Sequence, residues 1–353
     1  MPLDRRLFLQ SAALLLASAR AARAGAPGTL SLWAGEELRY GHDDGARAQA
    51  LFFDPRGLAL DPRDGAVIVA DAANALIRRV GADGRVTTLA GAAEQRASVD
   101  GTAAQARFVG PDAVAVGVDG TVYIADSFAN TIRVLRDGVV RTLAGRAGEP
   151  GYADGVGAQA QFNHPVGLAL RGEELLVADA YNHTLRAIEP GGRVRTIAGS
   201  PGVADHRDGA LRQALFNTPV GLALAADGTL YVSEYFNHDL RRVAPQGAVS
   251  TLAGKPGEAG DADGDGAAAR LRKPQQICVL PGSGDIVVAD GGNQKVRRVT
   301  PAGAVRTLAG QGAQDRFELG ALPGALVTPY GVAPAPGGGV LVSAGEALLL
   351  IRP

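Results

Sequence analysis

One short string recurs along this chain at an almost constant interval. Thr-Leu-Ala-Gly, or its variant Thr-Ile-Ala-Gly, occurs five times, ending at Gly91, Gly145, Gly199, Gly254 and Gly310. Successive copies are 54, 54, 55 and 56 residues apart, and the related string Leu-Ser-Leu-Trp-Ala-Gly ends 56 residues before the first copy. Such a period means that the fold is built from similar units, each packed against the next.

Each period contains four short apolar runs in the same order. In residues 165–199 these runs are "VGLAL", "ELLVAD", "HTLRAI" and "VRTIAG", and they are separated by turns rich in Gly, Asp and Pro. Runs of this kind predict β-strands joined by tight turns. The 49 glycines of the chain fit many such turns. We therefore predict an all-β fold of four-stranded antiparallel units, which at this period are propeller blades.

The two ends of the repeated region complement each other. The last period has only three apolar runs, at 331–333, 340–343 and 348–352, whereas residues 30–35 form a lone run with no strand before them. Strand 30–35 would complete the blade of residues 326–353, which gives a ring of six blades without an unpaired edge at the junction. We expect Trp33 to be buried in that strand.

Residues 1–24 have the features of an export signal. Arg5 and Arg6 precede an apolar run over 7–19, which is too short to stay in a bilayer as a spanning helix, and an Ala-x-Ala cleavage site follows. The paired arginines and their surroundings resemble the twin-arginine consensus of bacterial export signals. We expect residues 25–353 to form a single propeller domain that is periplasmic or secreted, monomeric, and not inserted in a membrane once the signal is removed.

Overall composition excludes some classes of function. The net charge is -1 and charged residues make up 20% of the chain, which argues against a nucleic-acid partner. Cys278 is the only cysteine, so neither an internal disulfide nor a cysteine metal cluster can form. Because Cys278 lies in an apolar run, we interpret it as a buried structural thiol.

The third run of each period and the residues before it resemble a known repeat. The segments "DAANALIRRV", "DSFANTIRVL", "DAYNHTLRAI", "EYFNHDLRRV" and "DGGNQKVRRV" are similar to the NHL repeat, named partly for its Asn-His-Leu core, and "FNHPVGLAL" and "FNTPVGLAL" also fit it. The resemblance extends over residues 30–353. It implies a six-bladed propeller used as a binding or interaction platform. Some propellers with similar repeats are enzymes, so the fold alone does not decide the function.

Three polar positions recur in the full periods, and we interpret them as structural. The second run ends in a carboxylate, at Asp71, Asp126, Asp179, Glu234 and Asp290. An asparagine follows, which we align as one repeated position, at Asn74, Asn130, Asn182, Asn237 and Asn293. The third run carries an arginine, at Arg78, Arg133, Arg186, Arg241 and Arg297. Short polar side chains organise turns, and we expect each arginine to pair with an acidic or backbone group between blades.

Positions that differ between the copies are candidates for function, because the structural demand is shared and the demand of a ligand is not. The residue after the repeated proline starts each innermost strand beside the central channel, and the set is Arg56, Asp112, Val166, Val220, Gln275 and Tyr330. Side chains converging there could hold a small polar ligand, with Arg56, Asp112, Gln275 and Tyr330 as candidates. The competing interpretation, which we favour, is that the charged members pair and close the channel.

A second variable set lies in the loops at the end of the ring where the innermost strands begin, which we call the top face. Its aromatic and histidine residues are Phe128, Tyr181, Tyr235, Phe236, His42, His164 and His206. Exposed aromatic side chains gathered on one face favour contact with a protein or a glycan. We select Tyr181 and Tyr235 as candidate binding residues. Packing of these rings between adjacent blades is the alternative.

These patterns favour an exported binding platform without catalysis, whose top face binds a protein, a glycan or a small polar ligand. The alternative is a metal-dependent hydrolase similar to the gluconolactonase propellers, which hold one ion in the channel. Asp112 is the only carboxylate among the six residues after the proline, so a complete cage for a hard ion is not evident. We expect no cofactor, and keep a channel-bound divalent ion such as calcium as the alternative.

Two other metal sites are less favoured by the sequence. Asp261, Asp263 and Asp265 have the spacing that begins a calcium-binding loop, but Arg272 stands where the bidentate glutamate is needed. We therefore interpret this stretch as an expanded copy of the repeated turn. A zinc lyase similar to the amidating propellers needs several histidine ligands, and the five histidines here are scattered over loops.

Overall fold

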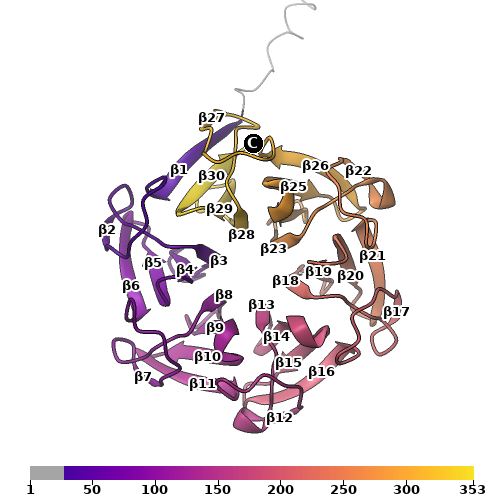
Figure 1. Ribbon diagram of the computed structural model, residues 1–353, viewed down its shortest axis with the longest axis horizontal. Coiled ribbons are helices and arrows are strands. Elements are labelled where there is room, and N and C mark those ends of the chain that lie inside the picture. The colour runs from indigo at the N-terminus through magenta and orange to yellow at the C-terminus, as the bar shows by residue number, and fades with distance from the viewer. Residues whose placement is uncertain (1–27) are drawn as a thin grey trace, which may run out of the picture.

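The computed structural model describes residues 28–353, and their long strands form six separate sheets. The sheets stand around a common axis like the blades of a propeller, and the chain runs once round the ring from indigo to yellow (Figure 1). Neighbouring strands within a sheet are antiparallel, and the first long strand of each blade lies innermost. The predicted all-β, six-bladed propeller is confirmed.

The first three blades share one pattern, in which a two-residue strand precedes four longer strands. Blade one contains β2 (Gly45–Ala46), β3 (Pro55–Leu60), β4 (Val67–Asp71), β5 (Leu76–Val80) and β6 (Arg85–Gly91). Blade two contains β7 (Gly101–Thr102), β8 (Pro111–Val116), β9 (Val122–Asp126), β10 (Thr131–Arg136) and β11 (Val139–Gly145). Blade three contains β12 (Gly155–Val156), β13 (Pro165–Arg171), β14 (Glu174–Asp179), β15 (Thr184–Ile188) and β16 (Arg193–Gly199).

The other blades repeat this pattern, with one change in blade six. Blade four contains β17 (Gly209–Ala210), β18 (Pro219–Leu224), β19 (Leu230–Glu234), β20 (Asp239–Val243) and β21 (Ala248–Gly254). Blade five contains β22 (Gly264–Asp265), β23 (Pro274–Val279), β24 (Ile286–Asp290), β25 (Lys295–Val299) and β26 (Ala304–Ala309). Blade six contains β27 (Gly320–Ala321), β28 (Pro329–Pro334), β29 (Val340–Ala344) and β30 (Ala347–Arg352), and takes its last strand, β1 (Thr29–Gly35), from the start of the described chain.

Short 3-10 helices, each three residues long, occupy loops on both faces of the ring. Three of them connect the second and third long strands of their blades, namely η1 (Ser127–Ala129), η3 (Ala180–Asn182) and η5 (Gly291–Asn293). Two follow a two-residue strand, namely η2 (Gly157–Gln159) and η4 (Gly266–Ala268). Within residues 28–353, no helix is long and apolar enough to cross a membrane. The export signal predicted for residues 1–24 lies outside the described residues.

The blades have five strands rather than the four predicted. In blade one, Gly45 and Ala46 of the additional strand β2 pair with Val86 and Arg85 of the outer strand β6. The sequence did not show this strand, because an Asp-Gly step signals a turn and two residues carry no alternation of apolar and polar side chains. The additional strand covers part of the outer edge of β6, which would otherwise present unpaired backbone groups.

The ring closes as predicted. β1 pairs with β30 along its whole length, so the first and last strands of the described chain share one sheet (Figure 1). Leu30 and Ala34 are fully buried against blade six and its neighbours. Trp33 is only partly buried, which corrects the expectation, because its ring lies at the margin of the apolar cluster with the guanidinium of Arg47 4.8 Å from its centre.

The apolar core lies between neighbouring blades. Each of six clusters of buried side chains joins two adjacent sheets. A phenylalanine occupies the same place in four clusters and is not exposed at all, at Phe52, Phe108, Phe162 and Phe216. Burying one such side chain stabilises the fold by roughly 1.5–3 kcal/mol. Every blade therefore depends on both of its neighbours for stability.

A buried arginine joins three segments of one blade. In blade three, Arg186 donates hydrogen bonds to the carboxylates of Asp179 and Asp154, each at 2.7 Å. It also donates to the carbonyl oxygens of Gln161 at 3.1 Å and Ala153 at 2.7 Å, and its side chain is fully buried. The end of β14, the middle of β15 and the loop before β12 thus meet at one guanidinium, and we call this arrangement the arginine clamp.

The clamp recurs in five of the six blades. Its other copies are Arg78 with Asp71 and Asp44, Arg133 with Asp126 and Asp100, Arg241 with Glu234 and Asp208, and Arg297 with Asp290 and Asp263. Each arginine pairs within its own sheet and not between blades as expected, because both acids belong to the same blade. In blade six, Leu349 faces Val342 at the arginine position, so apolar contacts replace the clamp.

Removing the closing strand should destabilise the whole ring. A variant lacking residues 1–35 loses the buried Leu30 and leaves β30 with an unpaired edge. We expect its free energy of unfolding, measured by urea denaturation, to fall by at least about 3 kcal/mol, as for loss of a buried leucine. A variant lacking only residues 1–27 is the control. Equal stability of the two variants would contradict this account of ring closure.

Candidate functional site

Two of the residues that follow the repeated proline form an ion pair at the channel mouth. Arg56 on β3 and Asp112 on β8, in neighbouring blades, are joined through the guanidinium and one carboxylate oxygen. Arg56 also donates to Asp54 at 2.9 Å, and its guanidinium lies 5.0 Å from the ring of Tyr330 on β28. Burial acts to lower the pKa of Arg56, but the combined effect of Asp112, Tyr330 and Asp54 outweighs it and raises that pKa above its ordinary value. The charged members of this ring do pair with each other.

Asp112 has a second neighbour on its other side. Its side chain is fully buried, and its Oδ2 atom accepts no hydrogen bond from residues 28–353. This oxygen lies 3.8 Å from Nε2 of His164 in the loop before β13. Burial lowers the pKa of His164, against the effect of the Asp112 charge, so the imidazole is neutral at pH 7. Asp112 therefore keeps an unused acceptor atom beside a neutral ring.

His164 connects the ion pair to two exposed aromatic rings. Its imidazole stacks on Tyr181, with ring centres 4.7 Å apart and planes 20° apart, and meets the edge of Phe128 at 5.2 Å. Tyr181 is 51% exposed and Phe128 is 58% exposed, so neither ring is packed beneath an adjacent blade. We call the set of Arg56, Asp112, His164, Phe128 and Tyr181 the mouth cluster.

The structure brings four of the six candidate residues together and separates the other two. Tyr330 contacts the mouth cluster through Arg56, and Tyr181 belongs to it. Tyr235 packs instead against the apolar starts of β13 and β18, and meets the edge of Phe236 at 4.9 Å. Gln275 lies on β23 in blade five, so blade six separates it from the strand of Arg56. The six side chains therefore do not line a single pocket.

One residue that was not singled out from the sequence crosses the channel. The side-chain amide of Gln276, which is only 8% exposed, donates to the carbonyl oxygen of Val166 at 3.4 Å and so joins β23 to β13 across blade four. The other inner strands have small residues at this position, namely Gly57, Ala113, Gly167, Gly221 and Gly331. The glutamine in place of a small residue was the feature of the sequence that could have identified this position. Farther along the inner strands the channel is lined by apolar side chains, including Leu58, Val114, Leu168, Leu222 and Val332.

One repeated position was aligned wrongly from the sequence. Asn130 does not correspond to Asn182 but to the next residue, His183, and both have a left-handed backbone, with φ of 60° and 58°. At this position the side chain accepts a hydrogen bond from the following blade, Asn130 from the N–H of His164 at 2.9 Å and His183 from the N–H of Thr218 at 3.1 Å. His183 therefore links blades three and four, and has a structural role.

The acidic loop of blade five is already neutralised by side chains of the protein. Asp261 forms ion pairs with Lys295 at 2.6 Å and with Arg297 at 2.5 Å, and Asp263 pairs with Arg297 at 2.5 Å. The remaining acid, Asp265, is 78% exposed. A cation at this loop would compete with fixed ammonium and guanidinium groups, which favours the interpretation of the stretch as an expanded turn.

Comparison with known proteins identifies relatives that share part of the chain. The chain is 29% identical over 282 residues, 75% of its length, to Protein SUPPRESSOR OF QUENCHING 1, chloroplastic, of Arabidopsis thaliana. It is 31% identical over 152 residues, 39% of its length, to NHL repeat-containing protein 2 of Bos taurus. The chain spans only about a quarter of these relatives, 26% and 21% of their lengths. No protein-family model matches it.

Solved structures with low sequence identity share the fold. An auxiliary nutrient binding protein from Bacteroides ovatus superposes with a TM-score of 0.69 at 15% identity, over 93% of this chain and 77% of that one. A gluconolactonase from Xanthomonas campestris superposes with a TM-score of 0.58 at 16% identity, over 90% of this chain and 98% of that one. At such identities the likeness shows the fold alone. Together with the NHL-containing relative, the ring of six blades supports an NHL-type propeller.

Two substitutions at or just after the end of β14 should distinguish a residue that stabilises the blade from one that only lies on its surface. Asp179→Ala leaves the guanidinium of Arg186 buried without its main partner, so we expect the free energy of unfolding to fall by about 3–5 kcal/mol. Tyr181→Ala removes a half-exposed ring and should change it by less than about 1 kcal/mol. Urea denaturation of both variants provides the measurement. Similar losses for the two would show that Tyr181 also belongs to the scaffold.

Proposed function

We propose that this protein is an exported binding protein whose ligand contacts the mouth cluster on the top face. The observation that carries the proposal is the connection of two half-exposed rings, Phe128 and Tyr181, to a buried ion pair through His164. Exposed rings supply contact area, and preorganised polar groups beside them orient a ligand. The arginine clamps use none of these residues, so the mouth cluster is free for this role.

A glycan or a similar small polar ligand suits this arrangement best. The faces of Phe128 and Tyr181 can pack against the apolar face of a sugar, while the Tyr181 hydroxyl offers both a donor and an acceptor. The Arg56–Asp112 pair is formed before the ligand arrives, so binding need not desolvate either charge anew. The shared fold with an auxiliary nutrient binding protein is consistent with a binding role.

A metal-dependent hydrolase is the alternative, because a gluconolactonase shares the fold. Such an enzyme needs a divalent ion in the channel, and Asp112 is the carboxylate of the inner ring. The guanidinium of Arg56 already lies against that carboxylate, and an added cation would be repelled by this fixed charge. The channel mouth therefore gives more support to binding than to hydrolysis.

The binding proposal predicts that a ring of the mouth cluster contributes to affinity. The protein is tested on an array of neutral and acidic oligosaccharides, and the affinity for the best binder is measured by titration calorimetry. Tyr181→Ala should weaken binding about 10-fold, the equivalent of about 1.4 kcal/mol. Val118→Ala, in an exposed turn on the opposite face, is the control and should bind normally.

Two outcomes would count against this proposal. Unchanged affinity in Tyr181→Ala would remove the mouth cluster from the binding surface. Hydrolysis of a sugar lactone that disappears in Asp112→Ala would favour the enzyme. In that variant, folding must be verified separately, because Arg56 loses a buried partner.

Export can be tested through the paired arginines. Replacing Arg5 and Arg6 together by lysine should leave the precursor, with its signal uncleaved, in the cytoplasm of a bacterial host. Replacement of Arg20 by lysine keeps the pair intact and is the matched control, so that variant should be exported and cleaved. Cell fractionation followed by mass measurement gives both results. Normal export of the double variant would contradict the twin-arginine assignment.

A further inference from the structure

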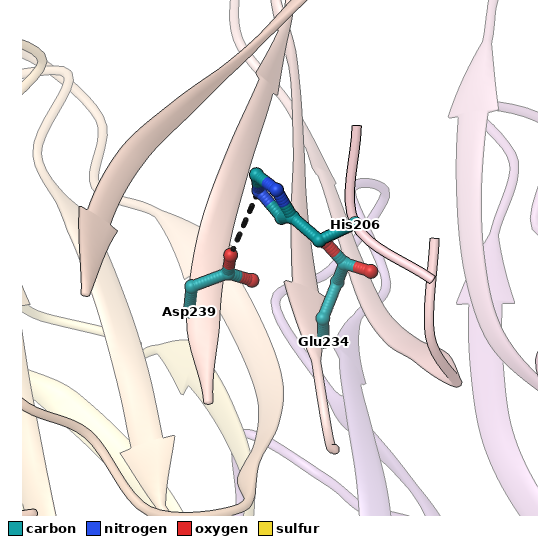
Figure 2. A group of neighbouring side chains, drawn as sticks. All are labelled: His206, Glu234 and Asp239. Carbon is teal, nitrogen blue, oxygen red and sulfur yellow. Dashed lines mark ion pairs between the residues drawn. The ribbon is translucent and has the colours of Figure 1, made fainter. Parts of the chain in front are cut away.

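Three potential metal ligands meet in blade four, away from the channel. Glu234 is the last residue of β19 and faces Asp239, the first residue of β20, across the hairpin. His206 comes from the long loop before β17. One ligand atom from each residue lies within 4.8 Å of the others, and Figure 2 shows the carboxylate of Asp239 directed toward the imidazole of His206.

The carboxylate of Asp239 has no counterpart in the other blades. The equivalent residues are Leu76, Thr131, Thr184 and Lys295, each at the start of the third long strand. The residues equivalent to His206, two positions before the repeated Asp-Gly, are His42, Ser98, Tyr152 and Asp261. In blade five these two positions hold an ion pair, with Lys295 2.6 Å from Asp261. Blade four instead combines a carboxylate with a histidine, beside the two acids of its clamp.

Asp239 is buried without a hydrogen-bond partner. Its side chain is 0% exposed, and neither carboxylate oxygen accepts a hydrogen bond from residues 28–353. Arg241 does not fill the gap, because its two terminal nitrogens already donate to Glu234 at 2.6 Å and to Asp208 at 2.7 Å. Blade four therefore contains a buried carboxyl group whose two oxygen atoms receive no hydrogen bond from the described residues.

The imidazole of His206 presents one nitrogen to several oxygen atoms. Its Nε2 atom lies 2.8 Å from Oγ1 of Thr251, 3.4 Å from Oδ2 of Asp239 and 3.9 Å from Oδ1 of Asp208. One N–H group can serve only one of these acceptors well, whereas a cation placed among them contacts several.

We propose that His206, Glu234 and Asp239 bind a divalent transition-metal cation of the zinc class. One imidazole nitrogen and two carboxylate oxygens are the donor types that zinc takes in tetrahedral sites, with bonds of about 2.0–2.2 Å. Glu234 retains lone pairs for this role, since its Oε2 accepts a single hydrogen bond, from Arg241. Calcium prefers oxygen ligands alone, so the histidine selects against it. The side chain of His206 is 22% exposed, which gives an ion access from the top face.

Titration with zinc chloride tests the proposal on the whole protein after removal of metal with a chelator. Calorimetry should show one saturable site per chain. Asp239→Asn and His206→Gln should each weaken binding more than about 100-fold, because losing even an outer partner of a ligand weakens metal binding roughly 10- to 100-fold. His42→Gln removes the histidine at the equivalent position of blade one, and should leave the affinity unchanged.

Thermal unfolding supplies a second readout that does not depend on the calorimetry. Zinc should raise the melting temperature of the unsubstituted protein and not that of Asp239→Asn, which should fold because it loses an unpartnered buried charge. The proposal is overturned if the unsubstituted protein has no saturable zinc site, if Asp239→Asn and His206→Gln bind zinc as the unsubstituted protein does, or if calcium binds in place of zinc. Absence of a zinc site would leave His206 and Asp239 as a contact between a histidine and a buried carboxyl group, 3.4 Å apart.

Discussion

A guanidinium buried near the top of each of five blades is the interaction on which the ring depends. It joins the second and third long strands to the loop that arrives from the preceding blade, and in four blades it also lies 5.1–5.4 Å from a buried phenylalanine ring. Burial raises the pKa of Asp71, Asp126, Asp179 and Asp290 to about 6, even though the arginines act in the opposite direction. The cost of burying each charge is thus offset only while the whole clamp is present.

The regularity of the clamp leaves other positions of the blade free to vary. Where the strands approach the axis, the variable residues form the Arg56–Asp112 pair and its aromatic neighbours instead of a uniform ring. In blade four, a variable residue, Asp239, adds a buried acid next to the clamp. Blade six differs in another way, because it lacks the clamp. Leu349 replaces the arginine there, and closure relies on apolar contacts. Scaffold and candidate sites therefore occupy different positions of one repeat.

The sequence predicted the features that recur and missed those that arise from contacts between distant residues. The period, the six blades and the closing strand follow from strings that are nearly identical in each copy. The two-residue outer strands carry no pattern of their own, and the wrong alignment of Asn130 became visible only from its left-handed backbone. The mouth cluster joins Asp112, His164 and Tyr181, which the sequence could select singly but not bring together. Asp239 differs visibly from its copies, yet its burial without a partner is a property of the packed hairpin.

If shared positions hold the ring together and variable positions of the top face are free for binding, a proteolysis-resistance scan of every residue in the full chain will separate the two classes. The expected result is loss of resistance for substitutions of the clamp arginines and their buried acids, with resistance kept at Phe128, Tyr181 and Asp239. Clamp residues that tolerate substitution as well as Tyr181 does, or a Tyr181 as sensitive as Arg186, would contradict this division.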